Sequence, residues 1–166
     1  MLAEILLPEF DREMATTRRL LERARDEDFQ WKPHEKSMTL HQLVAHLAQL
    51  PWWGEVVLTT ESLDLGGNMG DRTIPSSRAE VVAIFDRHVA ATRSRLNGKS
   101  DPEMVVPWTL RRGTQEIFTM PRILVLRTMV LSHMIHHRGQ LSVYLRQRDV
   151  PIPPIYGPSA DEGSWL

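Results

Sequence analysis

Apolar side chains recur along most of this chain at spacings of three and four residues, which is the period of a helix with one buried face. The first stripe consists of Leu6, Phe10, Met14, Thr17, Leu20, Leu21 and Ala24. Similar stripes follow later in the sequence. The pattern predicts four amphipathic helices, at Leu2–Arg25, Thr39–Leu63, Ser77–Leu96 and Pro121–Arg148.

Capping signals support three of these starts. Thr39 is followed three residues later by Gln42, and Ser77 is followed by Glu80 at the same distance. This spacing is typical of a capping box, in which two side chains satisfy free backbone amides at the first turn. Thr119 is expected to cap the last helix, because it stands just before a proline that suits a first turn.

Three features are expected to interrupt or shape the helices. Pro51 lacks an amide donor and its ring crowds the carbonyl of Leu47, so we expect a kink or break in the second helix. Gly139 is expected to allow two helices to approach closely. The segment 99–120 is compatible either with a short hairpin that turns at Arg112-Gly113 or with an ordered loop.

These elements predict an all-α fold: a four-helix bundle with a long irregular crossover before the last helix, and no sheet larger than a hairpin. The chain has 166 residues, which is a suitable length for one domain. We therefore expect a single domain over 1–166, in which residues 150–166 form an extended tail because prolines follow Val150.

Composition excludes several classes of protein. The sequence has no cysteine, which rules out disulfides, thiolate ligands and a cysteine nucleophile. The formal net charge is −1 and the basic residues are scattered, so no nucleic-acid partner is expected. Glu4, Pro8 and Glu9 interrupt the apolar run that a signal peptide needs, and no stretch is long enough to span a membrane. We expect a cytoplasmic protein without a membrane partner.

The histidines carry the candidate chemistry. His133 and His137 are four residues apart, so on a helix they point to the same face with about 6 Å between their β-carbons. Zinc proteases with the motif HExxH use the same offset. Here residue 134 is methionine instead of the glutamate that serves as general base, so a metalloprotease is not indicated.

Both histidines fall on the expected buried seam of the fourth helix, which is Leu126, Val130, His133, His137, Gln140 and Tyr144. His46 shares an apolar stripe with Leu43 and Leu50 on the second helix, so it is also expected to point inward. Burying three unpaired imidazoles is costly, and a bound metal ion would remove that cost. The sequence therefore predicts metal ligation by His46, His133 and His137.

The remaining conspicuous residues are assigned ordinary roles. His136 belongs to a neighbouring stripe, and Arg138 is expected to extend to solvent beside the seam. His34, His41 and His88 are interpreted as surface or packing residues. A buried histidine is more often a hydrogen-bonded core residue than a ligand, so a structural bundle whose histidines bond to one another and to water remains an alternative.

At these residues the chain resembles the DinB/YfiT-like metalloenzyme family over nearly its whole length. The matching segments are Trp31-Lys32-Pro33, Leu43-Val44-Ala45-His46-Leu47, Thr119-Met120-Pro121-Arg122, His133-Met134-Ile135-His136-His137-Arg138-Gly139-Gln140-Leu141 and Pro154-Ile155-Tyr156-Gly157-Pro158. The resemblance implies a four-helix bundle that is often a homodimer. It also implies a three-histidine metal site at His46, His133 and His137. A dimer is further favoured because five tryptophans are many for one small bundle to hide.

The resemblance also suggests a reaction class. Relatives include transferases that use mycothiol or bacillithiol and a maleylpyruvate isomerase, which implies a small-molecule substrate and a low-molecular-weight thiol in stress or detoxification chemistry. Three histidines leave open coordination positions, and Zn²⁺, Ni²⁺, Fe²⁺ and Mn²⁺ all accept imidazole. No residue stands out as a general base, so hydrolysis is the weaker expectation and no catalytic residue is assigned. The alternative is a metal- or small-molecule-binding module without turnover.

Overall fold

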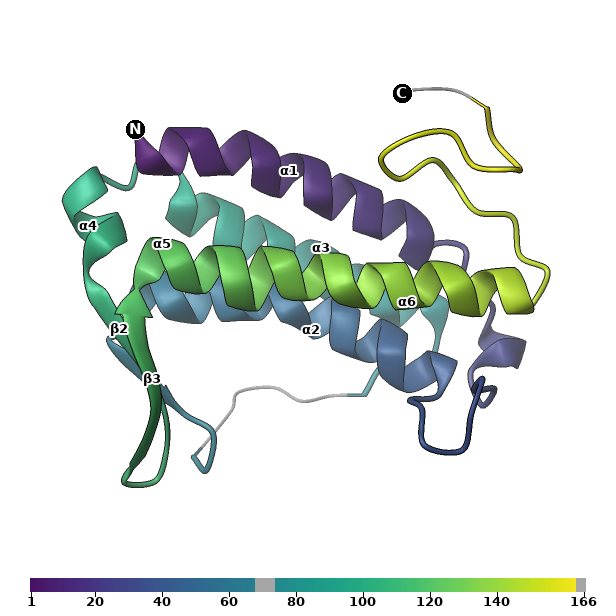
Figure 1. The fold of residues 1–166 in the computed structure, drawn as a ribbon, viewed down its shortest axis with the longest axis horizontal. Helices are drawn as coiled ribbons and strands as arrows, with labels where there is room; N and C mark the ends of the chain where they lie inside the picture. Colours follow the sequence, from purple (N-terminus) through teal and green to yellow (C-terminus); the bar gives the residue numbers. More distant parts are fainter. Residues whose placement is uncertain (68–73, 164–166) are drawn as a thin grey trace.

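The computed structural model describes residues 1–67 and 74–163, so the end of the predicted tail, 164–166, lies outside the described residues. The fold is mostly helical (Figure 1). Its longer helices are α1 (Leu2–Leu21), α2 (Leu40–Thr59), α3 (Arg78–Leu96) and α6 (His133–Gln147). The last of these continues directly from the short helix α5 (Arg122–Val125) and a π-helical segment, Leu126–Ser132. Shorter elements are the 3₁₀ turn Asp26–Asp28 and α4 (Asp101–Val105).

The helices expected from the apolar stripes are all present, with shorter ends. The first ends at Leu21 instead of Arg25, and the second ends at Thr59 instead of Leu63. A kink or a break was expected at Pro51; the break is wrong, because α2 runs through that residue, and the kink stays a prediction. The predicted capping box at Thr39 is confirmed by both of its hydrogen bonds.

The second predicted cap is confirmed in part. The hydroxyl of Ser77 accepts a hydrogen bond from the amide of Glu80, as expected for the residue that caps α3. The Glu80 carboxylate instead accepts from the amide and the hydroxyl of Ser76, so its return bond goes one residue further out.

A small sheet stands at one end of the helices, beside α5 in Figure 1. β2 (Pro107–Arg112) and β3 (Gln115–Pro121) form an antiparallel hairpin, in which Gly113 takes a φ of 58° that favours glycine. The hairpin alternative for segment 99–120 is thereby the correct one. β1 (Ser62–Asp64) adds a parallel third strand to β2. The expectation of no sheet larger than a hairpin was therefore wrong.

The third strand is explained by contacts between residues that are far apart in the sequence. Trp108 of β2 is fully buried, and its indole Nε1 donates a hydrogen bond of 3.1 Å to the Thr60 hydroxyl just after α2. This contact holds the chain beyond α2 against β2, where it pairs in extended form. Thr119 lies within β3 and contacts the hydroxyl of Thr109 at 2.8 Å, so the expectation that it caps the last helix was also wrong.

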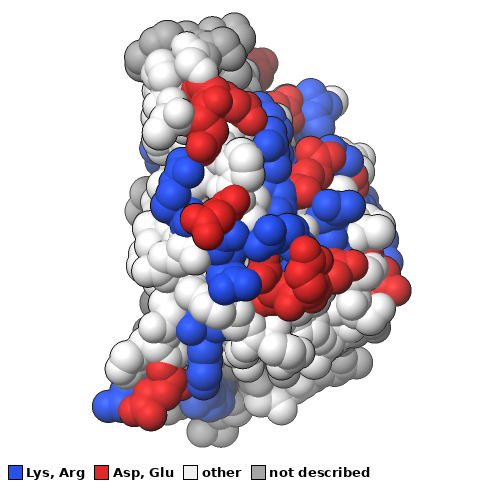
Figure 2. Space-filling view, turned by 90° about the vertical axis from the view of Figure 1, so that its right-hand side faces the viewer, with Lys and Arg blue, Asp and Glu red and all other residues white. Residues whose placement is uncertain are grey.

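Charged side chains of both signs alternate over the end of the molecule shown in Figure 2. Several of them attach the C-terminal tail, residues 150–163, to the helices. Arg23 near the end of α1 pairs with Glu162 at 2.6 Å, and Arg146 of α6 pairs with Asp161 at 2.5 Å. The tail is therefore fixed along the helices instead of extending away from them. No helix in the described ranges is long and apolar enough to span a bilayer.

The close helix approach occurs at Gly54, not at Gly139 as expected. A β-carbon at Gly54 would lie 2.4 Å from Cγ2 of Thr92 on α3, whose hydroxyl donates to the Pro51 carbonyl at 2.6 Å. Nothing lies within 4 Å of a β-carbon built at Gly139, which is exposed. Gly139 therefore tolerates a side chain and Gly54 does not.

Replacing Gly54 with alanine is expected to lower the free energy of unfolding by about 1–3 kcal/mol, because the new methyl group overpacks the α2–α3 contact. The matched change Gly139→Ala should raise it by about 0.5–1 kcal/mol through helix propensity alone. Urea denaturation of both variants measures the difference. Equal effects of the two changes would show that α2 and α3 can separate at little cost.

Candidate metal centre

The three histidines predicted as ligands come together where α2 and α6 pack. His46 lies in the middle of α2, His133 begins α6, and His137 follows one turn later. The Nε2 atom of His133 lies 3.3 Å from Nε2 of His46 and 2.9 Å from Nε2 of His137. One ligand atom from each residue lies within 4.8 Å of the other two, so this cluster can hold a metal ion. Within the described ranges no other group of side chains does so.

The cluster lies at the edge of the core instead of inside it. The buried residues of α6 are Met134, Arg138, Leu141, Tyr144 and Leu145, whereas His133 and His137 are half-buried and Gln140 is exposed. Leu126, Val130 and Tyr144 of the expected seam are buried, but between Val130 and Tyr144 the buried stripe passes through Met134, Arg138 and Leu141, one residue beyond His133, His137 and Gln140. The helix is π-helical over Leu126–Ser132, directly before the part of the stripe that is displaced. The displacement leaves the imidazoles accessible from solvent.

Burial favours the neutral form of all three imidazoles. Together with the charges of His137 and His133, it lowers the pKa of His46 to about 4. Burial also lowers the pKa values of His133 and His137, although a hydrogen bond to the Met129 carbonyl opposes this for His133 and one to Gln140 for His137. Neutral imidazole is the form that binds a metal ion.

Hydrogen bonds at the outer nitrogens set which ring atom carries the proton. Nδ1 of His137 lies 2.7 Å from the Gln140 side-chain oxygen, which can only accept, so Nδ1 donates and Nε2 keeps a lone pair. The ring of His133 donates to the Met129 carbonyl, and Nδ1 is free for this because Nε2 faces the other two imidazoles. The Nε2 lone pairs of His133 and His137 thus face each other at 2.9 Å, an arrangement that a cation between them would stabilise.

The spacing of the nitrogens fits a first-row transition metal. Nitrogens about 2.05 Å from one ion are separated by about 2.9 Å at a right angle and by about 3.3 Å at a tetrahedral angle. The observed separations of 2.9 and 3.3 Å fall at these two values. Gln140, which orients His137, was not recognised from the sequence as a partner, although its position three residues after the ligand is a usable signal.

The other histidines stay outside the cluster, as expected. His136 is exposed, although its ring centroid is 4.8 Å from that of His137. His41 stacks on Phe29 and contacts the Pro75 carbonyl, and His34 accepts a hydrogen bond from a neighbouring amide. His88 is buried on α3 and is not part of the cluster.

Arg138 differs from the expectation that it would extend to solvent. Its side chain is only 1% exposed and forms an ion pair of 2.6 Å with Glu13 of α1. It also donates a hydrogen bond of 2.7 Å to the Tyr156 hydroxyl in the tail. The prediction was wrong because both partners are remote in the sequence, and no local pattern identifies them.

The fold and the cluster together define a helical protein with a three-histidine cluster that could hold a metal ion. The model of the DinB family matches residues 2–164. This chain belongs to the DinB family.

Solved structures with the same fold are DinB-like proteins. The crystal structure of the DinB-like protein YjoA from Bacillus subtilis aligns with a TM-score of 0.71 over 95% of this chain and 98% of that one, at 18% identity. A DinB-like protein from Bacillus cereus aligns with a TM-score of 0.68 at 21% identity, over 90% and 95% of the two chains. At these identities the likeness shows the fold alone.

A short match to a curated protein also exists. The chain is 46% identical to the uncharacterized protein YrdA of Bacillus subtilis over 33 residues, which is 20% of either chain. The match therefore spans about a fifth of that relative's length.

Proposed function

We propose that this chain is a metal-dependent enzyme that binds one divalent ion through Nε2 of His46, His133 and His137. The observation that carries the proposal is the convergence of three neutral imidazoles, two of which have their Nε2 lone pairs turned towards each other by hydrogen bonds at the opposite nitrogen. A structural cluster of histidines would instead need a donor between these atoms. Zn²⁺, Ni²⁺, Fe²⁺ and Mn²⁺ are the candidate ions.

When bound by three imidazoles, such an ion lowers the pKa of a thiol or water at its open positions. Residues of the chain supply the remaining parts of the site. Gln140 holds the proton of His137 on Nδ1, and His133 and His137 are only half-buried, so that a small molecule can reach them from solvent. The metal-binding cluster contains no carboxylate that could serve as general base, which favours a nucleophile that ionises readily over activated water.

The reaction proposed is the transfer of a low-molecular-weight thiol to a small electrophile, or a related isomerisation. The thiol must be a cosubstrate, because the sequence has no cysteine. Membership of the DinB family supports this class of chemistry. We further propose that the chain works as one four-helix-bundle domain, as a homodimer and in the cytoplasm, in stress or detoxification metabolism.

Elemental analysis of protein purified without a polyhistidine tag tests the metal, and a conjugation assay with small thiols and electrophiles tests the reaction. One equivalent of a transition metal and thiol-dependent product formation are expected, and both should disappear after chelation. If the protein contains a metal ion but forms no product with any thiol tested, the alternative of a metal-binding module without turnover is favoured. Absence of metal from the protein, and failure of added Zn²⁺ or Ni²⁺ to bind, would contradict the proposal.

A further inference from the structure

A second polar cluster lies where α6 faces α1, on a different side of α6 from the three histidines. It consists of Glu13 and Thr17 of α1, Arg138 of α6 and Tyr156 of the tail, and we call it the Arg138 cluster. Nη2 of Arg138 contacts the Glu13 carboxylate at 2.6 Å and the Tyr156 hydroxyl at 2.7 Å. Nη1 donates to the Glu13 backbone carbonyl at 3.1 Å and to the Thr17 hydroxyl at 3.3 Å. The guanidinium is thus held from two sides.

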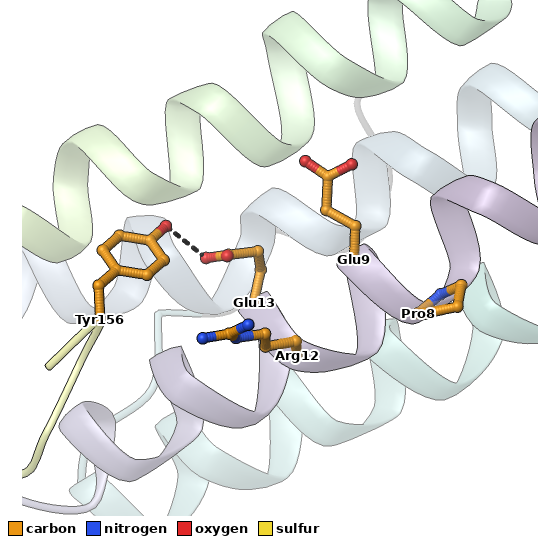
Figure 3. Close-up of a pocket in the computed structure, with 5 residues that line it drawn as sticks. All are labelled: Pro8, Glu9, Arg12, Glu13 and Tyr156. Carbon is orange, nitrogen blue, oxygen red and sulfur yellow. Dashed lines mark hydrogen bonds between the residues drawn. The ribbon is translucent and has the colours of Figure 1, made fainter. Parts of the chain in front are cut away.

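Tyr156 connects both charges of the cluster. Its hydroxyl accepts from Arg138 and donates to the Glu13 carboxylate at 2.9 Å, the bond drawn in Figure 3. The guanidinium carbon also lies 5.1 Å from the centre of the Tyr156 ring. The tail is therefore part of the cluster and does not merely cover it.

Stability alone does not explain a buried ion pair at this position. Removing two charges from water costs about as much as their attraction returns, and apolar residues of similar size often stabilise a protein equally well. An ion pair with several hydrogen bonds also fixes the orientation of the side chains, because the guanidinium donates its hydrogen bonds only within its own plane. Buried apolar side chains of α6 such as Met134 and Leu141 stabilise the packing of the helix, but they do not fix its rotation, because the hydrophobic effect has no preferred direction.

The position of Arg138 in α6 connects the orientation of its side chain to that of the histidines. It follows the ligand His137 immediately, so its side chain leaves the helix about 100° further round. α6 therefore presents its histidines to α2 and its arginine to α1. A rotation of α6 by about 10° would move an imidazole nitrogen, about 5–6 Å from the helix axis, by about 1 Å. Metal coordination tolerates deviations of only about 0.2 Å.

We propose that Arg138, held by Glu13 and Tyr156, is a positioning residue that fixes the rotation of α6 and so aims the imidazoles of His133 and His137 at His46. The inference rests on the proposed function in one respect, namely that these imidazoles bind a metal ion. It goes further in assigning part of the metal centre's geometry to α1 and to the tail, neither of which contributes a ligand.

Tyr156→Phe is the most selective test of this inference. Tyr156 is 52% exposed and borders, with Pro8, Glu9, Arg12 and Glu13, a cavity of about 360 Å³, so loss of its hydroxyl leaves the core unchanged (Figure 3). The matched control is Glu162→Gln, which breaks a different attachment of the tail, the 2.6 Å pair with Arg23. A general loosening of the tail would affect both variants.

Two measurements are made on each full-length variant. The first is the set of imidazole ¹⁵N and ¹H NMR signals of the metal-free protein, and the second is the dissociation constant and absorption spectrum of the Co²⁺ complex. Tyr156→Phe should shift the ring signals of His133 and His137, weaken Co²⁺ binding about tenfold and alter the cobalt spectrum. Glu162→Gln should match the wild type in its NMR signals, its Co²⁺ affinity and its cobalt spectrum.

A double variant covers the case in which the loss of one hydroxyl is absorbed locally. Glu13→Leu/Arg138→Met removes both charges, so the protein keeps an apolar contact and no unpaired buried charge. It should fold, yet show at least the NMR and cobalt changes expected for Tyr156→Phe. Wild-type signals and affinity in both Tyr156→Phe and the double variant would overturn the inference, as would equal changes in Glu162→Gln.

The two proposals fail in different ways. If the wild type binds no Co²⁺, the proposed metal-dependent function is contradicted, while the NMR signals of the metal-free variants still decide whether the Arg138 cluster orients the imidazoles. If the wild type binds Co²⁺ and neither variant differs from it, the metal centre stands and the positioning role is wrong.

Discussion

Replacing His137 with alanine is expected to weaken metal binding by at least about 100-fold, and His46→Ala and His133→Ala should do the same. Each change removes one of three nitrogens that lie within 4.8 Å of one another, and two imidazoles on their own hold a divalent ion poorly. Competition with a chromogenic chelator at neutral pH measures the loss. All three variants should fold, because the histidines lie at the edge of the core.

His136→Ala is the matched control for this experiment. Its ring lies beside that of His137, with 4.8 Å between centroids, yet it belongs to the exposed side of α6. The variant should retain wild-type affinity. Loss of metal in His136→Ala together with retention in His137→Ala would mean that the face of α6 has been assigned incorrectly.

The second large effect is expected for stability. Arg138→Met alone should lower the free energy of unfolding by about 3–5 kcal/mol, because it leaves the Glu13 carboxylate buried without its cation. Urea denaturation of the metal-free protein measures this change without any contribution from ligand binding.

An exposed ion pair provides the comparison. Arg93→Met breaks the pair between Arg93 and Asp11, whose side chains are 50% and 38% exposed, and should change the free energy of unfolding far less because water solvates both charges. If both substitutions cost the same, the environment of Glu13 is better solvated than its 8% side-chain exposure indicates. The double variant Glu13→Leu/Arg138→Met should recover most of the loss, since no charge is then left buried.

The parts of the fold that were predicted correctly depend on short-range patterns. Helix positions follow from the apolar stripes, and the start of α2 follows from Thr39 and Gln42, three residues apart. The grouping of His46 with His133 and His137 was also accessible, because each lies beside an apolar stripe on its own helix and two of them are one turn apart.

The parts that were missed depend on contacts between distant residues. A three-residue strand such as β1 has no periodicity of its own, and it lies where contacts such as that of Trp108 with Thr60 bring β2 to the end of α2. The burial of Arg138 requires Glu13, 125 residues earlier, and Tyr156 in the tail. The core stripe of α6 passes through Met134, Arg138 and Leu141 instead of the expected His133, His137 and Gln140, and no sequence period revealed the π-helical segment before it.

The parallel strand also has a consequence for the order in which the chain folds. The β2–β3 hairpin pairs residues that are close in sequence, whereas β1 pairs Ser62 with Thr109 across the whole of α3. Closing such a long segment costs more chain entropy than closing a hairpin, so distant pairings tend to form late. We expect the hairpin to assemble first and β1 to join only after α2 and α3 have docked. The three-stranded sheet is then a marker of completed folding.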